Sequence, residues 1–237
     1  GRFTINRSAL RLMTETSVAQ SVVFIAFLKP SHSGDYSNMN PLNSVLGAIV
    51  TGLVLVVALA LYLTGQSVVI TQLHLDRWLH IIAGITWIGL LYYFNVVQVP
   101  GLAAAVADKG GPGGAGVSKY IAPRALLWFR WAAVVTWLSG AYYLMIGYGS
   151  AATLHQAFTL QPGFRTIGIG AWLGTIMIFN VWVLIWPNQK KALGIVSATD
   201  DEKAKARKVA LIASRTNFAL SLPMLLCMAG QGHGLAF

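Results

Sequence analysis

Five apolar runs, each about as long as a lipid bilayer is thick, constrain this sequence more than any other feature. They occupy residues 44–63, 79–99, 125–148, 166–186 and 210–230. A helix needs about 20 apolar residues to cross the hydrocarbon core, and a backbone in lipid must satisfy its own hydrogen bonds. The sequence therefore predicts an all-α integral membrane protein with five transmembrane helices.

The composition agrees with a lipid environment and excludes several other classes. Hydrophobic residues make up 56% of the chain and charged residues 10%, whereas soluble domains carry roughly 25% charged residues. The net charge of +10 comes from basic residues in short connections, so we expect a lipid bilayer and no nucleic acid as the partner. The single cysteine, Cys227, and the lack of a CxxCH motif exclude a disulfide framework and covalently attached haem c.

The distribution of lysine and arginine predicts an orientation. Thirteen of these residues lie before the first run, between the second and third, or between the fourth and fifth. Only Arg77 and Arg165 lie in the connections on the other side. Because basic loops stay in the cytoplasm, we expect a cytoplasmic N-terminus and a periplasmic C-terminus in a bacterial inner membrane.

The first residues differ from the rest. Residues 17–28 are apolar but too short to span a bilayer, so they can lie flat on its surface. We interpret residues 1–38 as a cytoplasmic or interfacial extension, and residues 39–237 as the transmembrane domain. Met39 also reads like a natural start, in which case the extension is not native.

Two of the spans share a pattern at an offset of 85 residues. WIGLLYYFNV at 87–96 matches WLGTIMIFNV at 172–181 in five positions, and the same offset carries Arg130 onto Arg215. We expect the second and third spans to be repeated as the fourth and fifth. Both copies would enter from the same side, so the last four spans would form a bundle built from a parallel two-helix repeat.

Polar residues inside these spans are the first candidate site, because charge in a membrane is costly. Arg130, Arg215, Asn95 and Asn180 form two equivalent pairs under the repeat, and no Asp or Glu occurs in any span. One interpretation is that the arginines reach lipid headgroups while the asparagines bond across helices. Another is a binding site for an anion, a quinone or a purine, and a third is contact with a partner protein. Of the two arginines, we expect Arg215 to turn inward.

Histidines form the second candidate group. His80 begins the second span and His233 follows the fifth, so both are expected at the external side and at similar depth. Imidazoles there can ligate a haem b or a copper ion. The alternative is that they only form hydrogen bonds at the interface.

Three segments resemble a known family. HLDRWLHIIAGITWIGLLYYFNVVQVP (74–100), NVWVLIWPNQKK (180–191) and SRTNFALSLPMLLCM (214–228) are similar to the membrane domain of PuuD-type urate oxidases, also called urate hydroxylases. The resemblance covers roughly residues 39–233. It implies that a cytochrome c, joined to the C-terminus of full-length members, accepts the electrons. We interpret this chain as a short form without that domain.

Three functions remain open on the sequence. The first is an accessory or redox-linked membrane subunit of a bacterial assembly, with other membrane subunits or a cytochrome c as partners. The second is the membrane half of an oxidase for urate or a similar substrate, which would pass electrons to a separate cytochrome c. The third is a small transporter, which the parallel repeat and the polar groups within the spans suggest.

Overall fold

The structure, a computed structural model, describes residues 40–147 and 149–235, and the extension expected at 1–38 lies outside them. Within these ranges the chain is helical and contains no strand. It divides into two units, Gly1–Ile70 and Thr71–Phe237.

The described part of the first unit is a short 3-10 helix and one long α-helix. They are η1 (Pro41–Asn43) and α2 (Val45–Gly65). The hydroxyl of Ser44 accepts a hydrogen bond from the Gly47 N–H at 2.9 Å and caps α2. α2 covers the first predicted span and is apolar on all sides, which is typical of a helix that lipid can surround.

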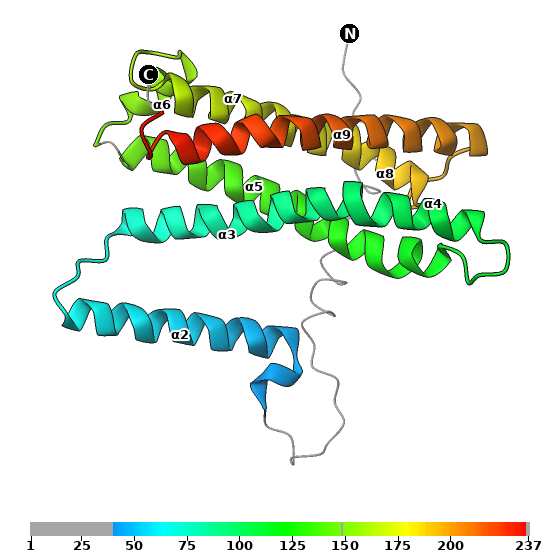
Figure 1. The fold of residues 1–237 in the computed structure, drawn as a ribbon, viewed down its shortest axis with the longest axis horizontal. Coiled ribbons are helices and arrows are strands. Elements are labelled where there is room, and N and C mark those ends of the chain that lie inside the picture. The colour runs from blue at the N-terminus through cyan, green and yellow to red at the C-terminus, as the bar shows by residue number, and fades with distance from the viewer. Residues whose placement is uncertain (1–39, 148, 236–237) are drawn as a thin grey trace, which may run out of the picture. The chain divides into compact units, whose positions relative to one another are not determined.

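The second unit is built from long helices joined by short turns. Its elements are α3 (Gln72–Tyr92), η2 (Tyr93–Gln98), α4 (Val99–Ala107), η3 (Val117–Ile121), α5 (Ala122–Ile146), α6 (Ala152–Phe158), α7 (Arg165–Phe179), η4 (Asn180–Ile185), α8 (Trp186–Ala192) and α9 (Asp200–Gly230). α3 packs mainly along α5, and α7 packs mainly along α9. The helices of each pair run in opposite directions, as Figure 1 shows.

The core of this unit lies where the two helix pairs meet. Its most deeply buried apolar side chains come from α3, α5, α7 and η4, and include Trp87, Leu91, Phe129, Met177 and Val181. The polar side chains of Asn217 and Ser221 on α9 are completely buried among them. The bundle interior therefore combines aromatic packing with polar contacts between helices.

Three π-helical segments interrupt the long helices, and a proline follows each at the same distance. η2, η3 and η4 end two residues before Pro100, Pro123 and Pro187, respectively. Proline has no N–H and its ring crowds the preceding turn. A widened turn relieves that conflict, so the helix continues without a break.

In the described part of the chain, four helical stretches are long and apolar enough to cross a membrane. They are Val45–Gly65, Gln72–Ala107, Arg165–Ala192 and Asp200–Gly230, and they contain the first, second, fourth and fifth predicted spans, except that Ser44 is the N-cap of the first stretch. α5 covers the third as far as Ile146; Gly147 is its C-cap, and residue 148 is not described. It is 25 residues long but is not among the four.

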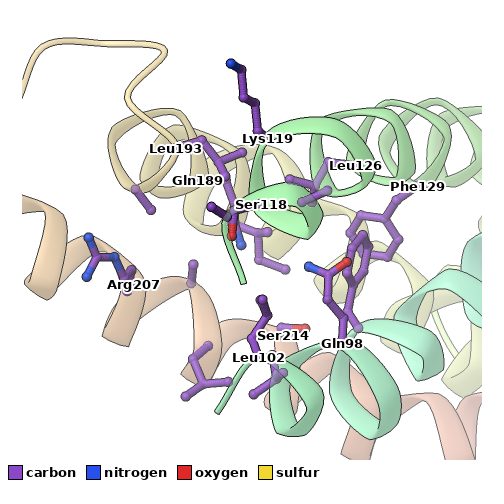
Figure 2. Close-up of a pocket in the computed structure, with 18 residues that line it drawn as sticks. Gln98, Leu102, Ser118, Lys119, Leu126, Phe129, Gln189, Leu193, Arg207 and Ser214 are labelled. Atoms are coloured by element: carbon purple, nitrogen blue, oxygen red, sulfur yellow. The ribbon is translucent and has the colours of Figure 1, made fainter. Parts of the chain in front are cut away.

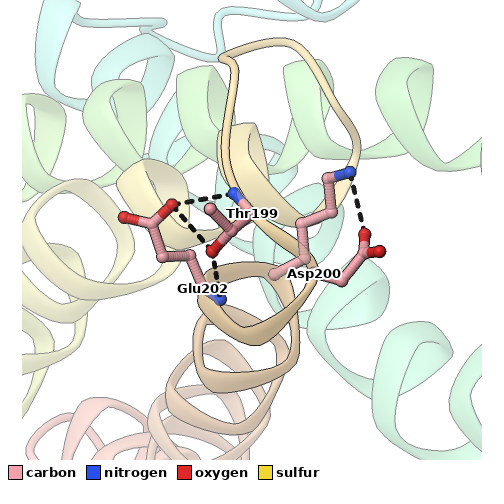
Figure 3. A network of polar contacts seen from close by, with 4 residues as sticks. Thr199, Asp200 and Glu202 are labelled. Atoms are coloured by element: carbon pink, nitrogen blue, oxygen red, sulfur yellow. Dashed lines mark hydrogen bonds and ion pairs between the residues drawn. The ribbon is translucent and has the colours of Figure 1, made fainter.

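The basic connection predicted before the fifth span is largely helical, which corrects the sequence analysis. Lys203, Lys205 and Arg207 belong to α9, which begins at Asp200. A capping box starts the helix, because Thr199 Oγ1 accepts from the Glu202 N–H and Glu202 accepts from the Thr199 N–H at 2.8 Å (Figure 3). Hydropathy does not indicate where α9 starts, because the first turns are charged, whereas the Thr-x-x-Glu pattern predicts that start.

Candidate functional site

Arg130 and Arg215 lie in different surroundings. Arg130 is only 4% exposed, and its guanidinium carbon lies 3.3 Å from the centroid of the Trp186 ring. Its Nε and Nη1 atoms are buried without a hydrogen-bond partner among the described residues. A cation over an indole ring is stabilised by about 2 kcal/mol when water is excluded.

Arg215 is exposed on α9, so the expectation that it turns inward was wrong. The inner face of α9 is set by Ala213, Asn217 and Ser221, which recur every four residues and are buried. Arg215 is two residues from both Ala213 and Asn217, which places it on the opposite side of the helix. The arginine that points inward is Arg130.

Asn95 and Asn180 each donate a hydrogen bond from the side-chain amide to α9. Asn95 Nδ2 lies 2.8 Å from Ser214 Oγ, and Asn180 Nδ2 lies 2.8 Å from Asn217 Oδ1. Asn217 in turn donates to the carbonyl of Met177 at 2.9 Å. Bonds of this kind join helices inside membranes. Neither of these asparagines nor either arginine lines the two cavities described next.

A cavity of about 730 Å³, here called the amide cavity, lies beside these contacts. It is bounded by η2, α4, η3, the start of α5, the end of η4, α8 and α9. Gln98, Ser118, Gln189 and Ser214 contribute its polar lining. Ser214 is the residue that Asn95 bonds, so the asparagine positions the wall of the cavity rather than facing into it.

One side of the amide cavity is aromatic. Phe94 and Phe129 both line it and meet edge to face, with their ring centroids 5.6 Å apart. Gln98 also belongs to the lining, where Figure 2 labels it, and its Oε1 atom is buried without a partner among the described residues. A buried amide oxygen without a donor costs free energy. The wall of the cavity therefore contains an amide oxygen that has no donor and that neighbouring side chains cover.

Positive charge lies at the rim of the amide cavity. Lys119 and Arg207 belong to its lining, both are exposed, and no Asp or Glu lines the cavity. Figure 2 shows the Lys119 amine extending away from the hollow. These two cations can attract an anion towards the opening over several ångströms without contacting it.

The second cavity, here called the histidine cavity, has a volume of about 480 Å³. Helices α3, α5, α7 and α9 form it, together with Phe158 at the end of α6 and the turn that follows α9. It brings together His80 and His233, the two candidate ligands for haem or metal. His74 and His155 do not line it. No group of three or more His, Cys, Asp or Glu side chains arranged for a metal ion occurs among the described residues.

Both imidazoles are held through the same ring nitrogen. His80 Nδ1 lies 2.9 Å from the Thr136 carbonyl oxygen, and His233 Nδ1 lies 2.8 Å from the Ala229 carbonyl oxygen. A carbonyl oxygen only accepts, so in each ring Nδ1 carries the hydrogen. The lone pair is then on Nε2, the atom left available to a ligand.

Sequence reasoning missed most of the amide cavity. Ser118, Lys119, Gln189 and Arg207 lie near helix ends or in the helical extension of α9, and they come together only when the helices pack. Trp186 as the partner of Arg130 was missed for the same reason. A sequence signal exists only for Gln98, which lies close to Asn95 on the same interrupted helix.

Comparison with known proteins identifies the family. The model of the family described as "Urate oxidase N-terminal" matches the chain twice, over residues 66–158 and 149–237. Searches of curated proteins and of solved structures returned no match. The two matched ranges together cover well over half of the chain. The apolar helices and this match agree on one conclusion: the chain belongs to the urate oxidase N-terminal family of membrane domains.

Proposed function

We propose that this chain is a redox-linked membrane subunit of an assembly that acts on urate or a similar anionic heterocycle, and that the ligand binds in the amide cavity. The observation that carries the proposal is a cavity of about 730 Å³ whose wall includes Gln98, a side chain with an unpartnered amide oxygen that a small turn would bring to a ligand. Small-molecule sites usually have volumes of about 300–1,000 Å³ and a few well-placed polar groups. The match to the urate oxidase N-terminal family supports urate or a similar compound as the ligand.

The lining suits a flat ligand that carries both N–H groups and oxygen atoms. Phe94 and Phe129 offer an aromatic wall against which a planar ring can stack. When the Gln98 side chain turns towards the cavity, its amide oxygen can accept a hydrogen bond from a ring N–H of the ligand. The hydroxyls of Ser118 and Ser214 can donate to exocyclic oxygens. An oxidised purine such as urate has both kinds of group around one planar ring.

The charge at the rim favours an anion over a neutral ring. Lys119 and Arg207 attract negative charge, and no acidic side chain in the lining opposes them. Because both are exposed, salt should screen their effect strongly. They would therefore raise the rate and apparent affinity of anion binding chiefly at low ionic strength.

The architecture we infer is a five-span protein with a duplicated helix pair. α5 supports a fifth span, since 25 residues extend about 37 Å at 1.5 Å per residue. The duplication is supported by the two family-model matches and by the π-helical segments beside Asn95 and Asn180. With the basic segments in the cytoplasm, the amide cavity would open on that side and the histidine cavity on the other.

Equilibrium binding of urate to the full chain in lipid nanodiscs tests the ligand proposal. We expect Gln98→Leu to weaken binding about tenfold, because one hydrogen bond contributes about 1–1.5 kcal/mol. Gln98→Glu should weaken it further, because its carboxylate repels the anion. The double change of Lys119 and Arg207 to alanine should reduce the salt dependence.

Lys208→Ala is the matched control, because Lys208 is an exposed cation next to Arg207 that does not line the cavity. Hypoxanthine, a neutral purine, is the control ligand. Equal binding of urate and hypoxanthine, together with no effect of Gln98→Leu, would exclude the amide cavity as the anion site.

A further inference from the structure

We propose that the histidine cavity is a haem b site, with Nε2 of His80 and Nε2 of His233 as the two axial ligands of the iron. The cavity lies at the other end of α3 from the amide cavity and shares no lining residue with it. A haem site here is therefore additional to the proposed function, and different residues test it.

Two contacts to one ring nitrogen fix the orientation of His80. Its Nδ1 donates to the Thr136 carbonyl at 2.9 Å, and the Ser139 hydroxyl lies 3.2 Å from the same atom. A carbonyl behind an imidazole sets its tautomer and strengthens the opposite nitrogen as a ligand. The described residues provide no partner for Nε2, so a strong donor atom remains unused at the cavity wall.

His233 is exposed but its segment is anchored. The side chain of Gln231 accepts from the Ile167 N–H and donates to the Gly163 carbonyl, both at 3.0 Å. The Thr166 hydroxyl donates to the Leu235 carbonyl. These bonds tie the turn after α9 to the start of α7 on both sides of His233, so its imidazole is held at the cavity opening.

Two glycines leave room for a flat group. A Cβ on Gly140 would lie 2.8 Å from Cε1 of His80 and would push the imidazole aside. Gly174 is buried and lines the cavity, yet a Cβ there would meet nothing within 4 Å. A buried glycine beside open space gives a smooth wall, which a planar macrocycle can approach closely.

The rest of the lining distinguishes haem from a bare metal ion. Trp137, Leu144 and Met224 make the cavity largely apolar, and two imidazoles are fewer than the three or four protein ligands of a zinc site. A porphyrin supplies four ligands of its own and fills apolar space. The lining also includes Arg77, one turn before His80, which is exposed at the opening and can pair with a propionate.

The test is an optical and electron paramagnetic resonance study of the full chain, purified in mild detergent and supplied with ferric haem. We expect a b-type difference spectrum on reduction with dithionite and a low-spin ferric signal. His80→Ala should lose most of the haem, and added imidazole should restore it by occupying the empty position. His233→Ala should keep the haem but convert the iron to the high-spin form.

His155→Ala is the matched control, because His155 is exposed on α6 and does not line the cavity. Gly140→Ala should shift the spectrum or lower the haem content, since it displaces the His80 ring. A chain that binds no haem, or a His80→Ala variant that retains it fully, would overturn the proposal. Urate binding by haem-free His80→Ala protein would separate this failure from a failure of the proposed function.

Discussion

The guanidinium carbon of Arg130 lies 3.3 Å from the centroid of the Trp186 ring, and the arginine is almost completely buried. The residue that corresponds to Arg130 in the internal sequence match is Arg215, which is exposed and stacks on no ring in the described structure. The two arginines that match in the internal repeat therefore lie in different environments, one buried and one exposed. The pair joins α5 to α8, next to the wall of the amide cavity.

A double-mutant cycle should show that Arg130 and Trp186 stabilise each other. We expect Trp186→Leu to lower the free energy of unfolding, and to lower it less when Arg130 is already leucine. The coupling should be about 1–2 kcal/mol, because the cation is desolvated over the ring. Lys190 is the control partner, since its amine lies 5.7 Å from the same ring centroid and should couple weakly. Equal coupling for the two cations would contradict this prediction.

The bond between Asn180 and Asn217 should matter for the stability of the bundle. Asn217 is fully buried. It accepts a hydrogen bond from the Asn180 amide and donates one to the Met177 carbonyl. Asn217→Leu leaves the Asn180 amide without its acceptor, so we expect unfolding in detergent to become easier by about 1–3 kcal/mol. Asn188→Leu is the control, because the Asn188 amide bonds only to the Leu184 carbonyl of its own helix. No difference between the two variants would show that this polar contact does not hold the helices together.

The capping box of α9 should be detectable by hydrogen exchange. Thr199→Ala removes the acceptor for the Glu202 N–H, and loss of an N-cap typically costs about 1 kcal/mol. Amide exchange in the first turn of α9 should become faster, while exchange near Asn217 should not change. Thr216→Ala, at an exposed position inside the same helix, serves as the control. Unchanged protection at 200–203 would contradict the assigned role of Thr199.

Reporter fusions should establish the orientation. We expect a reporter fused to the C-terminus to be active only outside the cytoplasm, and one inserted in the turn at Gly194 to be active only inside. The reason is the gathering of lysine and arginine in the segments assigned to the cytoplasm. A cytoplasmic C-terminus would mean that the number of spans is even. α5 would then be the first helix to re-examine, because it is not among the four described stretches that are long and apolar enough to cross a membrane.

Elements with a strong local signal were predictable from the sequence. The apolar runs predicted helices at the right places, because length and hydropathy are properties of the segment itself. The start of α9 was also encoded, in the pattern of Thr199 and Glu202, although the analysis of hydropathy passed over it. The family resemblance agrees with the match to the urate oxidase N-terminal family.

What only the tertiary structure decided was which residues meet. Sequence alone nominated both arginines, but the rotation of each helix about its axis, fixed by packing against its neighbours, buried Arg130 and exposed Arg215. The amide cavity joins side chains from seven helical segments, η2, α4, η3, α5, η4, α8 and α9. His80 and His233 were named from their positions at span ends, yet their shared cavity exists because α3 and α9 bring residues far apart in the chain to the same end of the bundle. Local sequence determines which helices form, and the packing between them determines which side chains face one another.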